Sequence, residues 1–538
     1  MKLNSSSIKN AEWKEKGYFV PSYDREAMIE KTKANPQWVH FGAGNIFRAF
    51  QANLSQRMLE DGSSDIGLTV VEGFDYEIIE KMYRPHDNLS ILVTLKADGN
   101  VEKSVIGSIA ESCILDSARD AEFNRLKEIF EKDSLQLATF TITEKGYSLV
   151  NAAGDILPAV KADFENGPDK PNSYIGKVSA LLYARYKAGE KKIAMVSTDN
   201  CSHNGDKLFA AVDAFAKEWT KAGKADAGFL SYIEDESKVS FPWSMIDKIT
   251  PRPDDSVNEI LKKDGIEELE PVVTSMKTWV APFVNAEESE YLVIEDKFPN
   301  GRPALEKVGV IFTDKETVDK VERMKVCTCL NPLHTSLAVY GCVLGYEKIS
   351  DEMKDENLVN LIRKVGYTEG LPVVTDPGVI KPSEFIDTVV NVRIPNVFMP
   401  DTPQRIATDT SQKLGIRFGE TIKAYDASEE LDVKSLKYIP LVQAGWLRYL
   451  LGVNDRGEKF EPSPDPLLEK AQGYVAGISL GETDQEKIKA AVLPLLKDAT
   501  IFGVDLESVG LSDLVISYFT ELIAGEGAVR KTLQKYCG

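Results

Sequence analysis

The stretch QWVHFGAGNIFRAFQANLSQRMLEDG, residues 37–62, decides the fold class of this chain. It starts with an apolar run typical of a buried strand, turns at two glycines, and continues with the spacing of an amphipathic helix. Gly42 permits a tight turn, and Gly44 lets backbone N–H groups approach a pyrophosphate at the helix N-terminus. A dinucleotide-binding turn usually has a third glycine where this chain has Phe47. The turn therefore indicates nucleotide binding, with an ordinary strand–helix connection as the alternative.

The first half of the chain repeats this alternation of strand and helix. A helix is predicted at NSYIGKVSALLYARYKAGE, residues 172–190. Further strands are predicted at DIGLTVVEGFD (65–75), LQLATFTIT (135–143), KKIAMVSTDN (191–200) and YLVIEDKF (291–298). Buried strands that alternate with helices are typical of a parallel, doubly wound sheet.

Strand signals fade after about residue 308, and FPNGRPALEKVG (298–309) marks the junction. Helices are predicted beyond it at KETVDKVERMKV (315–326), DENLVNLIRKVGY (355–367), TSQKLGIRFGETIKAYD (410–426) and KSLKYIPLVQAGWLRYLLG (434–452). We therefore predict two domains, a Rossmann-like α/β domain over residues 1–308 and a mostly α-helical domain over residues 309–538.

The composition narrows the class of protein. The 538 residues carry a net charge of −20, which argues against nucleic acid or an anionic membrane as the main partner. No apolar run approaches the roughly 20 residues that a membrane crossing needs, and the first residues lack the apolar core of a signal peptide. Six cysteines without a CxxC pair are typical of a reducing compartment. We expect a cytoplasmic protein with a small-molecule substrate, either a monomer or a small homo-oligomer.

An acidic residue follows the second predicted strand, at Glu72 or Asp75. A carboxylate there accepts hydrogen bonds from the ribose hydroxyls of adenosine and repels a 2′-phosphate. This position predicts NAD in preference to NADP, unless the acid is only a solvated turn residue.

MKVCTCLNPLHTSLAVYGC, residues 324–342, places a lysine, two cysteines, an asparagine and a histidine close together. One interpretation is a zinc site that would gather Cys201, His203, Cys327, Cys329 and His334, although these spacings differ from those of common structural sites. A second is a plain helix in which the cysteines belong to the core, Asn331 is the N-cap and Pro332 occupies the first helical position. A third is an active site built on Lys325.

The third interpretation has a chemical basis. Hydride transfer between an alcohol carbon and a nicotinamide needs a base for the hydroxyl proton and donors for the oxygen as it gains charge. A lysine whose pKa is lowered from about 10.4 by burial can serve as the base without a metal. Asparagine amides can stabilise the oxygen, and a histidine can fix a neighbouring hydroxyl.

The order of several motifs identifies a family resemblance over most of residues 38–417. The motifs are WVHFGAGNIFRAFQ, STDNCSHNG, MIDKITP, IEDKFPNGRP, VGVIFTD, ERMKVCTCLNPLH and DTPQRIATDTSQKL. The chain resembles the polyol-specific long-chain dehydrogenases, the metal-independent family of mannitol 2-dehydrogenase and the hexuronate reductases. In this family the third position of the glycine turn is commonly not glycine, so Phe47 fits.

The resemblance implies a role for each matching residue. It makes Lys325 the general base, Asn200 and Asn331 the amides that stabilise the oxygen, and His334 the residue that orients the substrate. It implies Glu322 as a proton-path residue and Arg405, Lys413 and Asp247 as substrate contacts. It implies NAD on the glycine turn, which we assign to Gly42, Gly44, Asn45, Ile46 and Phe47 with Glu72 and Asp75, and no metal. Arg405 and Lys413 are eight residues apart, so they would share one face of a continuous helix.

One departure from the family concerns the spacing after the lysine. The family usually has four residues between its lysine and asparagine, and this chain has the five residues VCTCL, followed by Pro332. An extra residue in a helix is often absorbed as a π-bulge, and a proline inside a helix breaks it. We therefore predict a bulge or break between Cys327 and Asn331.

The resemblance implies NAD-dependent interconversion of a keto sugar acid and its alditol acid, with D-fructuronate and D-mannonate as the first pair. Enzymes acting on mannitol, arabinitol or tagaturonate are the alternatives within the family. A zinc-dependent hydrolase and a non-catalytic sugar-acid binder are the alternatives outside it.

Overall fold

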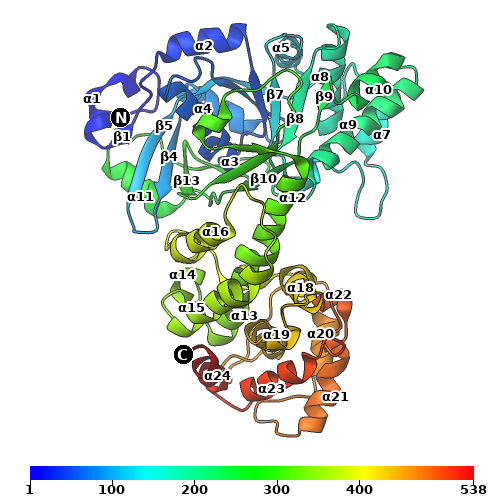
Figure 1. The fold of residues 1–538 in the computed structure, drawn as a ribbon. Helices are drawn as coiled ribbons and strands as arrows, with labels where there is room; N and C mark the ends of the chain where they lie inside the picture. Colours follow the sequence, from blue (N-terminus) through cyan, green and yellow to red (C-terminus); the bar gives the residue numbers. More distant parts are fainter. The chain divides into compact units, whose positions relative to one another are not determined.

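The computed structural model describes residues 1–538, and the chain divides into two compact units (Figure 1). The first unit comprises Met1–Lys96 and Asn100–Asp319, and the second comprises Lys320–Gly538 with Ala97–Gly99. The boundary falls within helix α12, Lys315–Met324. Our domain boundary after residue 308 stays a prediction.

A six-stranded sheet forms the centre of the first unit, with the order β6-β3-β2-β7-β8-β9. Its strands are β2 (Trp38–Phe41), β3 (Leu68–Glu72), β6 (Ile109–Ile114), β7 (Leu137–Phe140), β8 (Ile193–Ser197) and β9 (Val239–Ser240). Every neighbouring pair in this sheet is parallel. The strand order reverses between β2 and β7, which is the topology of the Rossmann fold and places its ligand crevice at this point. The predicted α/β class is confirmed.

Alternating side chains of these strands build two apolar cores, one on each face of the sheet. Val39 and Met195 belong to the core of one face, whereas Trp38 and Val196 belong to the core of the other. The helices on the first face include α5 (Asp120–Phe130), α7 (Pro158–Asn166), α8 (Tyr174–Lys187), α9 (Asn204–Lys221) and α10 (Ala227–Glu234). The second face is covered by α3 (Asn45–Ala49), α4 (Gln51–Glu60), the π-helical turn η2 (Ile79–Tyr83) and strands of smaller sheets.

Three smaller sheets accompany the central one. A four-stranded sheet has the order β1-β5-β4-β13, a three-stranded sheet β10-β14-β15, and β11 pairs with β12. Their strands are β1 (Tyr18–Phe19), β4 (Ser90–Leu95), β5 (Val101–Ile106), β10 (Ser244–Asp247), β11 (Val272–Val273), β12 (Trp279–Val280), β13 (Phe283–Glu287), β14 (Tyr291–Glu295) and β15 (Ile311–Thr313). The remaining helices of this unit are α1 (Ala11–Glu15), α2 (Arg25–Ala34), α6 (Thr143–Gly146) and α11 (Asp255–Lys263).

The predicted strand at residues 291–298 is present, but we placed it in the wrong sheet. It is β14, which pairs with β10 in an antiparallel register that joins Met245 to Val293 and with β15 in a parallel one. The sequence of a strand does not specify its partner, because a buried run packs equally well in either sheet.

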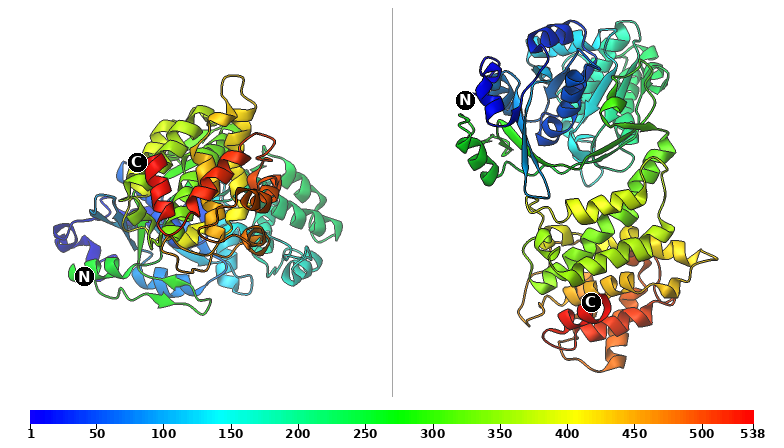
Figure 2. Two further views of the ribbon diagram at one scale, coloured as in Figure 1. Left: turned by 90° about the horizontal axis from the view of Figure 1, so that it is seen from below. Right: turned by 60° about the vertical axis from the view of Figure 1, so that its left-hand side comes forward.

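The second unit is helical (Figure 2), as predicted. Its α-helices after α12 are α13 (Asn331–Leu344), α14 (Ile349–Glu352), α15 (Glu356–Arg363), α16 (Pro382–Thr388), α17 (Pro403–Ala407), α18 (Glu420–Asp426), α19 (Tyr438–Leu450), α20 (Leu468–Val475), α21 (Gln485–Leu496), α22 (Ala499–Phe502), α23 (Ser512–Leu522) and α24 (Ala528–Cys537). Four π-helical turns interrupt this pattern, namely η5 (Lys325–Cys329), η6 (Lys364–Gly370), η8 (Val389–Arg393) and η10 (Gly415–Gly419). No helix has both the length and the apolar character that a membrane crossing requires.

Candidate active site

The glycine turn connects β2 to α3 at the point where the strand order reverses. Gly42 has φ +109°, and a Cβ atom there would lie 2.2 Å from the carbonyl oxygen of Thr141. The backbone N–H of Gly42 donates to the carbonyl of Val71 at 2.8 Å. Gly44 is the N-cap of α3, and a Cβ atom built on it would have no neighbour within 4 Å. Gly42 is therefore required by the protein itself, whereas Gly44 leaves open space at a helix N-terminus.

Glu72, at the end of β3, holds this turn in place. Its carboxylate accepts hydrogen bonds from the backbone N–H groups of Ala43 at 2.8 Å, Phe74 at 2.8 Å and Asp75 at 3.1 Å. Burial raises the pKa of this carboxyl, and the three backbone donors oppose the shift. Much of the acceptor capacity of Glu72 is thus used within the protein.

Asp75 retains an acceptor that the protein does not use. The side chain is 2% exposed, and its Oδ2 accepts a hydrogen bond from the Thr274 hydroxyl at 2.6 Å. Its Oδ1 is buried without a hydrogen-bond partner. A ribose hydroxyl would satisfy such an oxygen. Together with the open space at Gly44, Asp75 fits a dinucleotide on this edge of the sheet.

Asn45, Ile46 and Phe47 occupy the first helical turn after Gly44. The Asn45 side chain accepts a hydrogen bond from the Arg48 guanidinium at 2.9 Å, so it is oriented by the protein. The Phe47 ring is fully buried and stacks on His40 with ring centroids 4.4 Å apart. Phe47 therefore packs the helix against the sheet, the task that the third glycine usually performs by being small.

Asp199 organises the ends of β7 and β8, and our sequence analysis did not select it. Its carboxylate accepts hydrogen bonds from the N–H groups of Ile142 and Thr143, each at 2.9 Å, and from the Tyr147 hydroxyl at 2.5 Å. Asn200 follows directly and is exposed at the carboxyl end of β8. Asp247 is buried at the end of β10. The sequence feature that could have identified Asp199 is its position at the end of a strand. Its polar neighbours share that feature, so it did not single out Asp199.

Lys325 lies in the second unit and is the first residue of the π-helical turn η5. Its side chain is 3% exposed. The Leu330 N–H donates to the Lys325 carbonyl at 3.1 Å, the five-residue hydrogen bond of a π-helix, and the helix breaks at Leu330. The predicted bulge or break is confirmed. Glu322 lies in α12, three residues before Lys325 and thus on the same side of the helix.

The break allows α13 to begin at Asn331 with Pro332 in its first turn. A proline there displaces no helical hydrogen bond, because the first N–H groups of a helix have no partner within it. Asn331 is the first helical residue and Leu330 the cap, so the N-cap role that the plain-helix interpretation gave to Asn331 is wrong. Cys329 is buried, and burial raises the pKa of its thiol to about 12, which agrees with a core role.

His334 is surrounded by charged side chains. It lies one turn into α13, and burial lowers its pKa to about 4. The nearby Asp401 carboxylate opposes this shift, while Arg393, Arg417 and Arg405 reinforce it. The imidazole is therefore neutral at pH 7, and it can donate one hydrogen bond and accept another.

Arg405 and Lys413 do not share one helix face, because α17 ends at Ala407 and Asp409 has φ +56°. Arg405 forms an ion pair with Asp401, and its side chain is 63% exposed. The Lys413 ammonium donates to the carbonyls of Thr408 and, at 3.4 Å, Ile406. The continuous helix that would have aligned these cations is absent. Arg405 nevertheless lies close to His334, and Lys413 lies close to Arg417.

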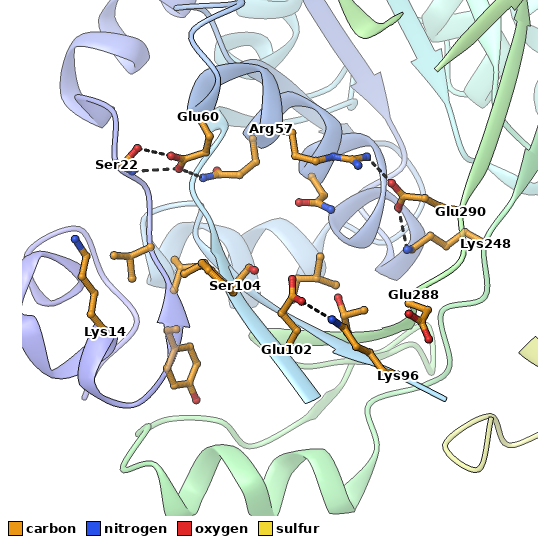
Figure 3. A pocket seen from close by; sticks show the side chains of 18 residues that line it. Lys14, Ser22, Arg57, Glu60, Lys96, Glu102, Ser104, Lys248, Glu288 and Glu290 are labelled. Carbon is orange, nitrogen blue, oxygen red and sulfur yellow. Dashed lines mark hydrogen bonds and ion pairs between the residues drawn. The ribbon is translucent and has the colours of Figure 1, made fainter. Parts of the chain in front are cut away.

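Within each unit, no metal-ligand cluster is present, and the hollow of the first unit is lined by residues other than the predicted site residues. Neither unit contains a group of three or more His, Cys, Asp or Glu side chains that could hold a metal ion. A hollow of about 850 Å³ in the first unit is lined by eighteen other residues (Figure 3). Its cations are largely paired, for example Lys96 with Glu102 at 2.9 Å and Lys248 with Glu290 at 2.9 Å. The hollow is therefore lined by none of the predicted catalytic, cofactor-binding or substrate-binding residues.

Comparison with known proteins agrees with this geometry over the whole chain. The Mannitol dehydrogenase Rossmann domain matches residues 36–307, and the Mannitol dehydrogenase C-terminal domain matches residues 317–520. The D-mannonate oxidoreductase of Thermotoga maritima is 52% identical over 541 residues, which cover 100% of this chain and 99% of that protein.

Two solved structures share the fold from end to end. A crystal structure of D-sorbitol dehydrogenase in substrate-free form is 25% identical with a TM-score of 0.80, covering 99% of this chain and 100% of that one. A ternary complex of Pseudomonas fluorescens mannitol 2-dehydrogenase with NAD and D-mannitol is 27% identical with a TM-score of 0.67, covering 99% of both chains. These matches define an oxidoreductase with a nucleotide-binding Rossmann domain that acts on a CH–OH group. The chain belongs to the mannitol dehydrogenase family.

Proposed function

We propose that the protein interconverts D-fructuronate and D-mannonate with NAD(H). In the reductive direction, D-fructuronate, NADH and one proton give D-mannonate and NAD⁺. The observation that carries this proposal is the 52% identity, over the full length of both chains, to a protein named D-mannonate oxidoreductase. The match of the lysine-bearing turn to the family's motif supports it.

The proposal gives each part of the nucleotide edge a task. The open N-terminus of α3 at Gly44 receives the pyrophosphate, with the residues from Asn45 to Phe47 around it. Asp75 Oδ1 accepts a hydrogen bond from a ribose hydroxyl, and its charge adds to that of Glu72 in repelling a 2′-phosphate. The preference is therefore for NAD. When bound, the nicotinamide supplies or accepts the hydride.

Lys325 is the general acid and base in this proposal. It donates a proton to the ketone oxygen during reduction and removes the hydroxyl proton during oxidation. The amides of Asn331 and Asn200 donate hydrogen bonds to the same oxygen as its charge grows. Neutral His334 binds a neighbouring hydroxyl, Glu322 passes protons to and from solvent, and Arg405, Lys413 and Asp247 contact the substrate.

A neutral polyol is the second candidate substrate. Mannitol 2-dehydrogenase and D-sorbitol dehydrogenase share the whole fold at 27% and 25% identity. These identities are about half of that to the D-mannonate oxidoreductase. The sugar acid is therefore the first choice.

The test is a substrate panel with purified protein and both reduced cofactors. We expect kcat/KM to be highest for D-fructuronate with NADH, and lower for tagaturonate, fructose and any substrate with NADPH. Faster reduction of fructose would replace the proposal by the polyol alternative. Equal use of NADPH would show that neither Glu72 nor Asp75 acts on the ribose. The cytoplasmic location and the monomeric or small homo-oligomeric state stay predictions.

A further inference from the structure

Arg417 is a partly buried cation for which the protein provides no carboxylate. It lies in the middle of the π-helical turn η10, and its guanidinium donates a hydrogen bond to the hydroxyl of Thr335. No acidic side chain forms an ion pair with it. Burial lowers its pKa to about 10, so the side chain remains positively charged at neutral pH.

Arg405 and Lys413, which the proposed function also places at the substrate, each have a partner within the protein. Arg405 forms its ion pair with Asp401, and the Lys413 ammonium is directed at two backbone carbonyls. Arg417 makes a single hydrogen bond to a neutral hydroxyl, which leaves most of its five N–H donors available. A partly desolvated guanidinium without an anion is costly, and an incoming carboxylate would offset that cost.

Two glycines fix the place of this turn. A Cβ atom on Gly415 would lie 3.1 Å from the backbone nitrogen of Gly503, and one on Gly419 would lie 2.3 Å from the carbonyl oxygen of Phe502. The turn is therefore pressed against the end of α22, where larger residues would not fit. It also packs against η5, the turn that begins with Lys325, and against α13.

The side chain of Arg417 reaches α13, the helix that carries His334, and its charge acts on the His334 imidazole. Thr335, which accepts its hydrogen bond, is the residue next to His334. A substrate held by His334 would have its polar groups within reach of this guanidinium. An arginine also suits a carboxylate, because two parallel N–H donors match its two oxygens.

We propose that Arg417 binds the carboxylate of the substrate and so determines the preference for sugar acids over neutral polyols. This inference rests on the proposed function, since it assigns the carboxylate of that substrate to one residue. The bond is charge-assisted, and a neutral ketose, which has no carboxylate, would gain little from it.

The experiment compares D-fructuronate with D-fructose on the same proteins at saturating NADH. We expect Arg417→Gln to lower kcat/KM for fructuronate at least tenfold through KM, and to change that for fructose less than twofold. Arg417→Lys keeps the charge and should recover part of the loss. Arg456→Gln, which removes an exposed arginine in the loop after α19, is the matched control and should behave as wild type. Equal losses on both substrates would overturn the inference and make Arg417 a structural residue.

A binding measurement separates this inference from the proposed function. D-mannonate is titrated into wild type and Arg417→Gln in the presence of NAD⁺, and heat is recorded. Tighter binding to wild type by at least tenfold supports the role of Arg417, even if turnover of hexuronates is absent and the proposed function fails. Turnover of fructuronate with equal binding by both proteins overturns the inference and leaves the proposed function intact. A wild type that neither binds nor turns over a sugar acid overturns both.

Discussion

The nucleotide edge of the first unit and the lysine-bearing helices of the second unit obtain their geometry by different means. At the nucleotide edge the geometry is set mainly by the backbone. A parallel sheet sets the crevice, Gly42 adopts a positive φ, and Glu72 collects three backbone N–H groups. In the helical unit the geometry is set mainly by side chains on interrupted helices. Lys325 and Arg417 each lie in a π-helical turn.

The two regions also treat charge differently. The Glu72 carboxylate is buried, but three backbone N–H groups donate hydrogen bonds to it and so stabilise its charge within the protein. Arg417 has only a hydroxyl as its partner. The first arrangement is complete without a ligand, whereas the second leaves an interaction to be made. This contrast teaches that the nucleotide edge should be sensitive to changes in backbone shape, and the helical site to changes in side-chain chemistry.

The largest expected effect tests the side-chain half of this contrast. Lys325→Ala should reduce turnover by about 10²–10⁴-fold, because the general acid and base is lost. NADH binding, followed by fluorescence titration, should remain close to that of wild type. Lys423→Ala, an exposed lysine on α18, is the control and should retain full activity. Wild-type turnover at neutral pH in Lys325→Ala would remove the lysine from the mechanism.

A smaller effect tests the backbone half with two neighbouring glycines. Gly44→Ala places a methyl group in open space at a negative φ, so the free energy of unfolding should change by less than about 0.5 kcal/mol. The same methyl group would meet the pyrophosphate, and the Kd for NADH should rise at least tenfold. Gly42→Ala should instead destabilise the protein by about 1–3 kcal/mol, because it combines a positive φ with a contact to Thr141. Denaturant unfolding and NADH titration measure both. Unchanged NADH affinity in Gly44→Ala would place the pyrophosphate elsewhere.

A third effect appears only on acidification and concerns the protonation of His334. Its pKa of about 4, against an ordinary 6.5, means that the folded protein holds this imidazole neutral while the unfolded chain binds a proton. Stability is therefore lost as the pH falls from about 6.5 towards 4, and His334→Gln should make this part of the stability curve less steep. Part of the slope should remain, because burial also lowers the pKa of His40, to about 3, and that of His86. The chain has four histidines, so nitrogen NMR with His334→Gln as the assignment control can follow the ring directly. An imidazolium signal for His334 at pH 5.5 would contradict the burial argument.

Local patterns predicted much of the first unit, because strand and helix spacing is a property of adjacent residues. Residues 38–41, 68–72, 137–140 and 193–197 were recognised as strands and form the middle of the sheet. The short β9 and the edge strand β6 were missed. β9 has only two residues, and β6 carries polar side chains at Glu111 and Ser112. The local pattern also does not predict which strands pair with each other. β14, for example, pairs with β10 and β15 and not with the central sheet.

The helical site was predictable mainly through resemblance. Spacing alone left Lys325, a zinc site and a plain helix open, and the family's motif decided among them. The π-helical turn followed from counting one extra residue before Asn331. The partners of Glu72 are backbone groups, which no sequence pattern reveals. Arg417 was given no role by our sequence analysis, and its lack of a carboxylate partner emerges only from the folded contacts.

The four π-helical turns of the second unit affect how the sequences of related proteins should be aligned. A π-helical turn accommodates one more residue than an α-helical turn while the helix on either side keeps its course. Insertions and deletions of single residues can therefore accumulate in this unit without displacing what lies beyond them. Alignments should show isolated one-residue gaps at such turns, close to Lys325 and Arg417. Transferring a functional position across this part of the family by ungapped counting would select the adjacent residue, on a different side of the helix.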